Sequence, residues 1–392
     1  FITISNGTDG NIDGVRHGNE RVLHARLNDA EFFYREDQKT RLADKVERLG
    51  SVVFHAKLGS LLDKAERLKA LVKFIGAELK LAEKTTHHAE RAAWLCKADL
   101  TTHMVIEFPS LQGITGRYYA KNSDESEPVA SAIAEHYQPL GADTPLPETE
   151  VGAILAIADK LDTIVGYFGI EERPTGSQDP YSLRRHALGT IRILQDRQLP
   201  ISLDAVVQKA ISLYEVELVG DTEISVLNFI RERMRVILQT QEYTPDLADA
   251  VLAVGGVDIV DILKRASALA EFRLTPNFED IYNALNRVLR ILPENAPETV
   301  DAVLLKDDAE KELNTHITDA EPDFEKSIQA RAYPKLLQQL AELQPAIDKF
   351  FDDVLVMAED AELRRNRLAL LNRIAKHVYA VADLTKLVIA GE

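Results

Sequence analysis

Histidine and aspartate side chains gather in two stretches where the spacing of apolar residues predicts helices. The segment "HHAERAAWLCKADL" contributes His87, His88 and Asp99, and "ADKLDT" contributes Asp159 and Asp162. Imidazole nitrogens and carboxylate oxygens are common ligands of divalent metals in proteins. If the fold brought these side chains together, they could form a metal site on a helical scaffold.

The residues around Asp99 argue against such a metal site. Helical metal-dependent phosphohydrolases carry an adjacent His-Asp doublet, and this chain has no His-Asp pair anywhere. Where the doublet would be expected, the chain reads "CKAD", which places Lys97 close to Asp99. A lysine ammonium competes with a metal for the same carboxylate. We therefore expect buried ion pairs here, such as Lys97 or Lys160 with Asp99 or Asp162.

A second segment, "FPSLQGITGRYYAK", combines two glycines with a cation and two aromatic rings. Arg117 and Lys121 could contact phosphate, and the rings of Tyr118 and Tyr119 could stack on bases. The segment follows no predicted strand and lacks the glycine spacing of a nucleotide-binding loop. A packed corner between a loop and a helix fits the same residues, so both interpretations stay open.

A third segment, "PTGSQDPYSLRR", predicts the start of a helix with Asp179 as N-cap and Pro180 as its first residue. The helix continues as "YSLRRHALGTIRILQ", with Arg184, Arg185 and Arg192 available to a ligand. Arginines near the free N–H groups of a helix start suit a phosphate. The alternative is a surface helix whose arginines form ion pairs within the protein.

The end of the chain reverses the sign of its charge. The net charge is −17, yet basic residues outnumber acidic ones over residues 361–392. The apolar spacing there predicts a helix with Arg364 and Arg367 on its outward face. Such a face could follow a phosphate backbone, or it could simply be solvated.

Composition limits the classes of protein to consider. The acidic net charge argues against a nonspecific nucleic-acid binder, which usually has a basic surplus, but it does not forbid a local basic face. The single cysteine, Cys96, excludes an internal disulfide and any zinc site made of several cysteines. The sequence shows neither an apolar run long enough to span a bilayer nor a secretory signal, so we expect a cytoplasmic protein.

The periodicity predicts a mainly all-α protein in several parts. Only the opening run "FITISN" reads as a strand, and we interpret it as the end of a larger upstream body. Nearly everything that follows has the 3.6-residue apolar spacing of helices. The expected parts are a short β-containing remnant (1–45), a helical domain (46–215), a helical linker region (216–275) and a helical bundle (276–392).

Five motifs, in this order, resemble the beta subunit of bacterial glycyl-tRNA synthetase, and the resemblance covers essentially the whole chain. It corresponds to the C-terminal part of that subunit. The motifs are "VVFHAKLGSLLDKAERL", "AAWLCKADLTTHMVIEFPSLQGITGRYYA", "IADKLDTIVGYFGI", "RPTGSQDPYSLRRHALGTIRI" and "IDKFFDDVLVMAEDAELRRNRLALL".

The resemblance implies a fold and a division of labour. The family enzyme has two alpha and two beta subunits, and its alpha subunit charges glycine tRNA with the use of ATP and Mg. The beta subunit binds tRNA, so no cofactor and no catalytic residue is expected in this chain. Residues 46–215 would resemble a His-Asp phosphohydrolase domain without its metal doublet. Residues 276–392 would resemble the helical anticodon-binding domain shared with arginyl-tRNA synthetase.

Resemblance and local charge together imply two sets of tRNA-binding residues. Those expected at the anticodon end are Arg364, Arg365, Arg367 and Arg373. Those expected on the acceptor side are Arg117, Lys121, Arg184, Arg185 and Arg192. Two other functions remain as alternatives, namely a metal-dependent phosphohydrolase and a helical scaffold that binds the alpha subunit without RNA.

Overall fold

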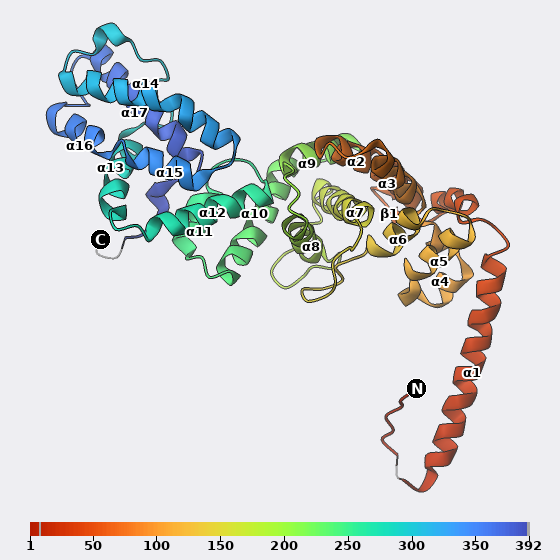
Figure 1. Cartoon of the computed structure of the whole chain (residues 1–392). Coiled ribbons are helices and arrows are strands. Elements are labelled where there is room, and N and C mark those ends of the chain that lie inside the picture. Colours follow the sequence, from red (N-terminus) through yellow and green to blue (C-terminus); the bar gives the residue numbers. More distant parts are fainter. Residues whose placement is uncertain (8, 390–392) are drawn as a thin grey trace. The chain divides into compact units, whose positions relative to one another are not determined.

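The computed structural model describes residues 1–7 and 9–389, and these residues are mainly helical, as predicted. Figure 1 shows the chain as a series of helices joined by short connections. The chain divides into two compact units, each described below by itself. Unit 1 is Phe1–Ile193 with Ala205–Val226, and unit 2 is Leu194–Asp204 with Leu227–Glu392.

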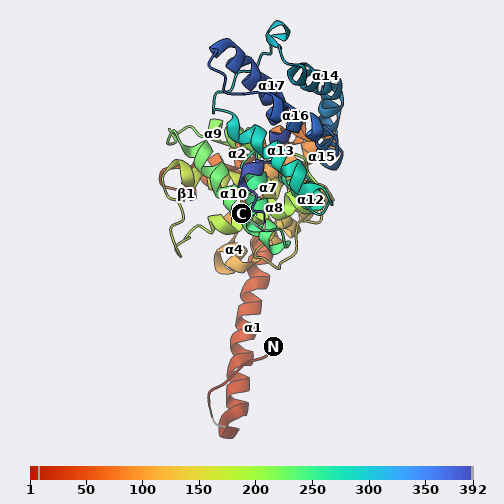
Figure 2. The ribbon, with the colours of Figure 1, turned by 90° about the vertical axis from the view of Figure 1, so that its left-hand side faces the viewer.

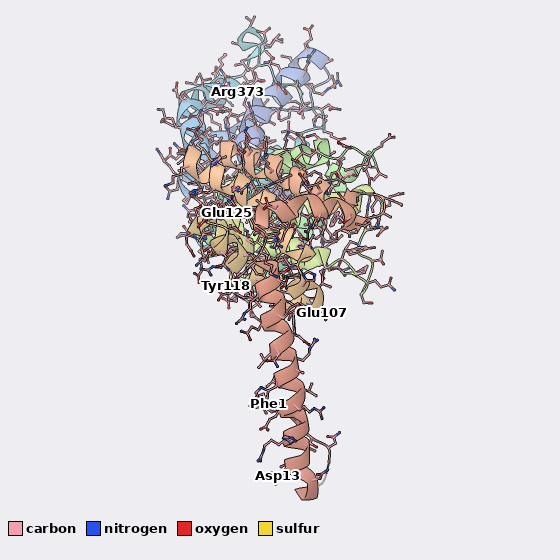
Figure 3. All side chains as sticks on the ribbon, turned by 90° about the vertical axis from the view of Figure 1, so that its right-hand side faces the viewer. Phe1, Asp13, Glu107, Tyr118, Glu125 and Arg373 are labelled. Atoms are coloured by element: carbon pink, nitrogen blue, oxygen red, sulfur yellow. The ribbon has the colours of Figure 1, made fainter. Side chains whose placement is uncertain are left out.

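Unit 1 opens with a long helix, α1 (Ile12–Asp37), which extends away from the other helices of the unit (Figures 1 and 2). Asp13 lies near its far end, whereas Glu107 and Tyr118 lie where it joins the unit (Figure 3). The strand predicted for "FITISN" does not form, since residues 1–6 adopt no regular structure. An extended segment needs a neighbouring strand to pair with, and α1 follows it instead.

Among the described residues, a short hairpin forms a sheet of two strands. Strands β1 (Val53–His55) and β2 (Gly59–Ser60) pair antiparallel. Ser60 then caps α2, because its hydroxyl accepts the N–H of Asp63 while the Asp63 carboxylate accepts the N–H of Ser60. This reciprocal capping box fixes where α2 begins.

The carboxylate of Asp37, buried at the end of α1, fastens that helix to the unit. It accepts the backbone N–H groups of His103 and Met104, at 3.0 and 2.9 Å, and the hydroxyl of Tyr119. These N–H groups open the helix α4 (His103–Glu107), where a negative charge is favourable.

The core of unit 1 forms around α7 (Glu150–Gly169), in which every residue from Val151 to Gly169 is buried. A helix that is buried on all sides lies at the centre of a domain, and its charged residues Asp159, Lys160 and Asp162 then need buried partners. Helices α2, α3 and α6 pack against α7, and its position among them can be followed in Figure 1. The other α-helices of the first part of the chain are α2 (Leu61–Glu78), α3 (Glu83–Leu95), α5 (Ile114–Asn122), α6 (Glu127–Glu135), α8 (Leu183–Asp196) and α9 (Leu203–Ser212).

Unit 2 is a helical bundle built around α17 (Ala361–Tyr379), which packs against α13, α14 and α15. Leu370, Ile374 and Val378 lie one turn apart on the buried side of α17, as the apolar spacing predicts. The other α-helices of this part are α10 (Thr222–Thr240), α11 (Pro245–Leu252), α12 (Ile259–Arg273), α13 (Phe278–Ile291), α14 (Asp308–Gln329), α15 (Tyr333–Ala341) and α16 (Gln344–Asp353).

The linker region predicted for residues 216–275 is shared between the units. Its residues up to Val226 belong to unit 1, and those from Leu227 onward belong to unit 2. The boundaries predicted for the four parts stay predictions. Among the described residues, no helix is both long and apolar enough to cross a membrane.

Candidate nucleic-acid interface

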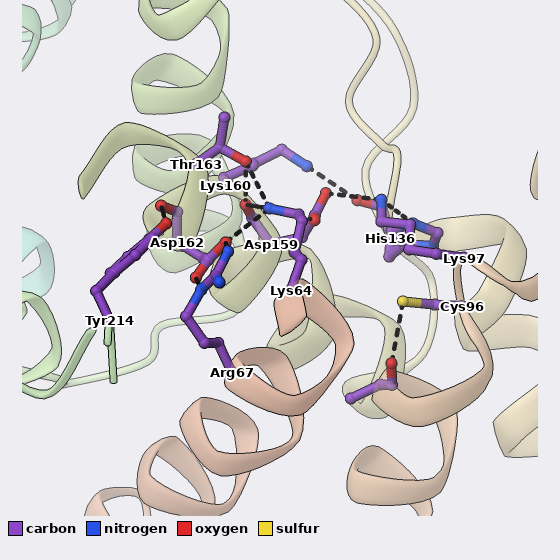
Figure 4. A network of polar contacts seen from close by, with 11 residues as sticks. Lys64, Arg67, Cys96, Lys97, His136, Asp159, Lys160, Asp162, Thr163 and Tyr214 are labelled. Atoms are coloured by element: carbon purple, nitrogen blue, oxygen red, sulfur yellow. Dashed lines mark hydrogen bonds and ion pairs between the residues drawn. The ribbon is translucent and has the colours of Figure 1, made fainter. Parts of the chain in front are cut away.

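Lys97 and the two aspartates of "ADKLDT" meet in a buried cluster of charges in unit 1 (Figure 4). The predicted histidines stay outside it, since His87 is exposed and His88 is half-buried on α3. Helix α7 contributes two aspartates, one turn apart, and α2 contributes two cations with the same spacing. Lys64 Nζ lies 3.1 Å from Asp159 Oδ1 and 2.9 Å from Asp162 Oδ2. The guanidinium of Arg67 holds both carboxylate oxygens of Asp162, with its Nε 2.7 Å from Oδ1. Each aspartate therefore faces at least one fixed cation.

A third cation enters the cluster from the turn after α3. Lys97 Nζ lies 3.3 Å from Asp159 Oδ2 and 2.8 Å from Nε2 of His136. Lys160 instead donates to the backbone carbonyls of His136 and Gln138, at 3.1 and 2.7 Å. Burial lowers the pKa of Lys160 to about 8, because its ammonium meets neutral carbonyls where water would otherwise solvate it.

The cations hold the aspartates in their ionised form. Burial alone would raise the pKa of Asp159, but the ammonium groups of Lys64 and Lys97 outweigh it and keep the pKa well below its usual value. Lys64 and Arg67 likewise lower the pKa of Asp162 against the effect of burial. The cluster is therefore a set of ionised pairs within the protein interior.

Buried ion pairs are present, as predicted, but the residues that pair differ from the predicted ones. Lys97 pairs with Asp159, and Asp162 pairs with Lys64 and Arg67. Asp99 accepts the backbone N–H of Gly113 at 2.6 Å, and burial raises its pKa to about 6. The sequence shows which residue types are present, but the partners depend on which helices pack together.

The residues of this cluster do not fit a divalent metal. Lys64 and Lys97 fill the position between Asp159, Asp162 and His136 where a metal ion would have to bind. Among the described residues, no group of three or more histidine, cysteine, aspartate or glutamate side chains could hold a metal. The chemistry of a metal-dependent phosphohydrolase therefore has no support in the side chains of unit 1.

The arginines of α8 bind the protein's own carbonyl groups. Arg184 donates to the carbonyls of Gly176 and Gln178, whereas Arg185 and Arg192 donate to the loop before α7. The last two reach the carbonyls of Leu140, Gly141 and Thr144 at 3.0–3.3 Å. A carbonyl carries no net charge, so these contacts do not compensate the positive charge of the guanidinium groups. That charge can therefore still attract an anion from outside the protein.

The start of α8 differs from the predicted one by three residues. The helix begins at Leu183 and not at Pro180, because residues 180–182 form a turn in which Ser182 has a φ of +56°. The Asp179 carboxylate still caps it, accepting the N–H groups of Leu183 and Arg184 at 2.8 and 2.9 Å. The Asp179 side chain thus caps the helix as predicted, but from four residues before Leu183 and not from the N-cap position, and the predicted first helical residue is wrong.

On α5, two predicted tRNA-binding cations share a single carboxylate. Lys121 and Arg117 each lie 2.8 Å from Glu127, and these contacts lower the pKa of Glu127 to about 2. Tyr118, next to Arg117, is 55% exposed, whereas Tyr119 is buried against α1. The α5 surface therefore carries one surplus positive charge beside one available ring.

The four arginines of α17 have three different environments. Arg367 is only 7% exposed, and its guanidinium binds Glu310, Asp307 and the carbonyl of Leu355. The prediction that Arg367 faces outward with Arg364 is wrong, because α14 begins against this side of α17. Arg365 is exposed, and Arg364 is half-buried and donates to the carbonyl of Ala358 at 3.1 Å.

Arg373 lies two turns further along α17. Its guanidinium pairs with Glu321 at 2.6 Å and also donates to the side chain of Asn314 at 2.8 Å. The side chain keeps partial access to solvent. Of the four predicted residues, Arg364, Arg365 and Arg373 can reach a ligand without unfolding the bundle.

Comparison with known proteins assigns the chain to a family. Residues 1–253 match the glycyl-tRNA synthetase beta subunit, and residues 278–387 match the DALR anticodon binding domain. The chain belongs to the glycyl-tRNA synthetase beta subunit family. The resemblance inferred from the five motifs is therefore confirmed.

Curated relatives in this family are named glycine–tRNA ligase beta subunit. The one from Geobacter metallireducens is 45% identical over 390 residues, which make up 99% of this chain and 56% of the relative. The one from Syntrophomonas wolfei is 43% identical over 392 residues, or 99% and 57% of the two chains. The one from Marinobacter nauticus is 41% identical over 398 residues, or 100% and 57%. The chain thus spans a little over half the length of these beta subunits.

Sequence reasoning missed two of the cations in the buried cluster of this beta-subunit chain. Lys64 and Arg67 each come directly before a buried apolar residue of α2, Ala65 and Leu68, at the edge of the stripe that predicts the buried face. A basic residue at such a position usually needs a buried acidic partner. This spacing was a signal that could have found both residues.

Proposed function

We propose that the chain is the tRNA-binding portion of a glycine–tRNA ligase beta subunit. In this proposal a separate alpha subunit activates glycine with ATP and Mg and transfers it to the tRNA. The observation that carries the proposal is the match of residues 278–387, which form most of the bundle around α17, to an anticodon-binding domain. The beta-subunit match of residues 1–253 supports glycine tRNA as the substrate and the alpha subunit as the partner.

The chemistry of unit 1 supports a binding role without a reaction centre in this chain. Its buried aspartates Asp159 and Asp162 are paired with Lys64, Arg67 and Lys97, so their carboxylates are not free to bind a metal or to act as a general base. The thiol of Cys96 is buried, which raises its pKa to about 12 and removes the reactive thiolate. We therefore assign the tRNA contacts of unit 1 to its surface.

We propose that unit 1 contacts the phosphates of the tRNA, and that unit 2 contacts the anticodon loop. Arg184, Arg185 and Arg192 keep their full charge, because their protein partners are neutral oxygens, and they would contact phosphates of the acceptor arm. Arg117 and Lys121 would add a weaker contact, because both form ion pairs with Glu127, which compensates part of their charge. On unit 2, Arg364, Arg365 and Arg373 would serve the anticodon loop.

A binding titration of the purified chain with glycine tRNA tests this proposal. We expect binding that weakens steeply as salt rises, because each phosphate contact releases counterions. We also expect weaker binding of a tRNA with a different anticodon. Binding that is indifferent to both salt and anticodon would contradict the proposal.

The same preparation tests the two alternative functions. Capture of the alpha subunit without any binding of tRNA would show a scaffold instead of a tRNA-binding protein. A bound divalent metal in stoichiometric amount, together with turnover of a phosphodiester substrate, would show a phosphohydrolase. We expect neither result. We also expect that the native protein is recovered from the cytoplasm together with its alpha subunit.

A further inference from the structure

The connection between α7 and α8 presents a tight turn, residues 175–178, which we call the tip. Thr175 and Gln178 exchange two backbone hydrogen bonds, in which the N–H of each donates to the carbonyl of the other, at 3.1 and 2.8 Å. Gly176 has a φ of +48°, a conformation that glycine adopts at little cost. Arg184 of α8 donates to its carbonyl at 2.8 Å. All four residues of the tip are exposed, so unit 1 presents a narrow projection with a defined backbone.

The base of the same connection is fastened by aromatic and charged side chains. The ring of Tyr181 stacks on that of Tyr167 in α7, with the two ring centroids 3.9 Å apart. The Glu172 carboxylate accepts the hydroxyl of Tyr181 and lies 3.3 Å from Nε2 of His55 in β1. Glu172 and Tyr181 therefore hold the two ends of the connection together. A surface that is ordered before binding loses less entropy when a ligand arrives.

Basic groups outnumber acidic ones next to the tip. Between residues 174 and 185 the sequence has one carboxylate, that of Asp179, and it accepts two N–H groups at the start of α8. Arg184 and Arg185 donate to neutral oxygens, so their positive charge is not compensated by these contacts. The exposed Glu171 belongs to the base of the connection, near the end of α7. The tip therefore has a positive surplus beside it, which suits phosphate groups.

The tip itself carries neutral polar side chains. Thr175 and Ser177 have hydroxyl groups and Gln178 has an amide, and each of these side chains can both donate and accept a hydrogen bond. The 2′-hydroxyl of a ribose has the same two capacities. A double helix of RNA displays its 2′-hydroxyls along a wide and shallow minor groove, whereas DNA has none. A narrow, uncharged tip with arginines beside it thus matches the riboses of that groove and the phosphates along its edge.

We propose that the tip enters the minor groove of the acceptor stem of the tRNA, where Ser177 and Gln178 bind 2′-hydroxyl groups. Arg184 and Arg185 contact the phosphates beside the groove. This inference rests on the proposed function, and it adds the element that makes the contact, the groove that it enters and the chemical group that it recognises. The contact depends on ribose and on the shape of the RNA helix, so it holds the acceptor stem whatever its base sequence.

The test measures the affinity of the whole chain for glycine tRNA with and without 2′-O-methyl groups in the acceptor stem. These groups block the ribose hydroxyls and leave the charge of every phosphate unchanged. We expect the methylated tRNA to bind on the order of 10-fold more weakly, because hydrogen bonds to the ribose hydroxyls are lost. The salt dependence of binding should stay the same, since the number of phosphate contacts does not change.

A double variant of the tip assigns the effect to Ser177 and Gln178. Ser177→Ala/Gln178→Ala should bind natural tRNA roughly 10-fold more weakly than the parent chain, and methylation should then have little further effect. Arg184→Ala should instead reduce the salt slope by about one. The control variant Gln38→Ala/Ser51→Ala removes the same two side chains from exposed positions elsewhere on unit 1 and should bind like the parent chain.

Two outcomes would overturn the assignment to the tip. Either methylated tRNA binds as well as natural tRNA, or methylation weakens binding by the double variant as much as binding by the parent chain. In both cases salt-dependent binding of the tRNA would leave the proposed function standing. If the chain binds no tRNA, the proposed function fails and this inference fails with it. Urea unfolding followed by Trp94 fluorescence checks that unit 1 is folded in each variant.

Discussion

Lys97 and His136 form a hydrogen bond in which the ammonium donates to the ring, with 2.8 Å between Nζ and Nε2. The other ring nitrogen, Nδ1, lies 2.7 Å from the carbonyl of Ile133 and donates to it. This arrangement requires a neutral imidazole, because a protonated ring would turn an N–H toward the ammonium. Burial and the charge of Lys97 accordingly keep the pKa of His136 well below 6.5. Both ring nitrogens of His136 are therefore engaged within the protein, one by a lysine and one by a carbonyl.

Acid should destabilise unit 1 through this histidine. Below about pH 6.5 the unfolded chain protonates His136 and the folded chain does not, so the free energy of unfolding falls as pH falls. The slope from one histidine is at most about 1.4 kcal/mol per pH unit. His186, with a pKa lowered by burial to about 4, acts in the same direction, whereas Asp99, with its pKa near 6, opposes them between about pH 4 and 6.

The measurement is urea unfolding between pH 7 and pH 5, followed by tryptophan fluorescence. Trp94 is the only tryptophan of the chain and lies in α3, so the signal reports unit 1 alone. The variant His136→Gln keeps an acceptor for Lys97 and cannot take up a proton in this range. We expect it to flatten the pH dependence, and an unchanged slope would contradict the assignment to His136.

Replacing Lys64 should destabilise unit 1 strongly. The variant Lys64→Met leaves the carboxylates of Asp159 and Asp162 with one cation fewer in the interior, which costs about 3–5 kcal/mol. Lys73→Met removes the same charge from an exposed position of α2 and should change stability by less than about 0.5 kcal/mol. Urea unfolding followed by Trp94 fluorescence compares the two variants, and equal stability would refute the role of Lys64.

Arg367 and Arg365 should separate stability from binding. Arg367→Ala leaves the buried Glu310 without its guanidinium, so unit 2 should lose about 3–5 kcal/mol in urea unfolding followed by circular dichroism. Arg365→Ala removes an exposed charge and should leave stability unchanged. If Arg365 contacts a phosphate, the variant should weaken tRNA binding and reduce the salt slope by about one. Unchanged binding of Arg365→Ala would remove that residue from the proposed interface.

Arg192 should control the order of the loop before α7. Its guanidinium donates to the carbonyls of Gly141 and Thr144, and Arg192→Ala leaves both without this donor. We expect faster hydrogen exchange of the backbone amides over residues 140–146, with little change in the core helix α7. The control variant Arg48→Ala removes an exposed guanidinium elsewhere on unit 1 and should leave that loop as it is. Equal exchange in both variants would show that the loop does not depend on Arg192.

Much of the fold could be predicted from local patterns. The helical spacing of α7 and α17, the cap at Asp179 and the Ser60–Asp63 capping box each depend on residues a few positions apart. The family could also be predicted, because five ordered motifs need no knowledge of three-dimensional contacts. The strand expected in residues 1–6 failed because a strand is defined by a partner, and apolar alternation does not supply one.

The sequence by itself determined that this chain is helical, that it belongs to a beta-subunit family, and that its His-Asp doublet is absent. Only the tertiary structure decided that Lys64 and not Lys97 joins Asp159 to Asp162, and that Arg367 is buried while Arg365 is exposed. The reason is the range of the interactions. A helix forms from contacts three and four residues apart, whereas the environment of a charge depends on the helix packed against it. Arg367 meets Glu310, 57 positions earlier in the chain, and no local pattern links the two.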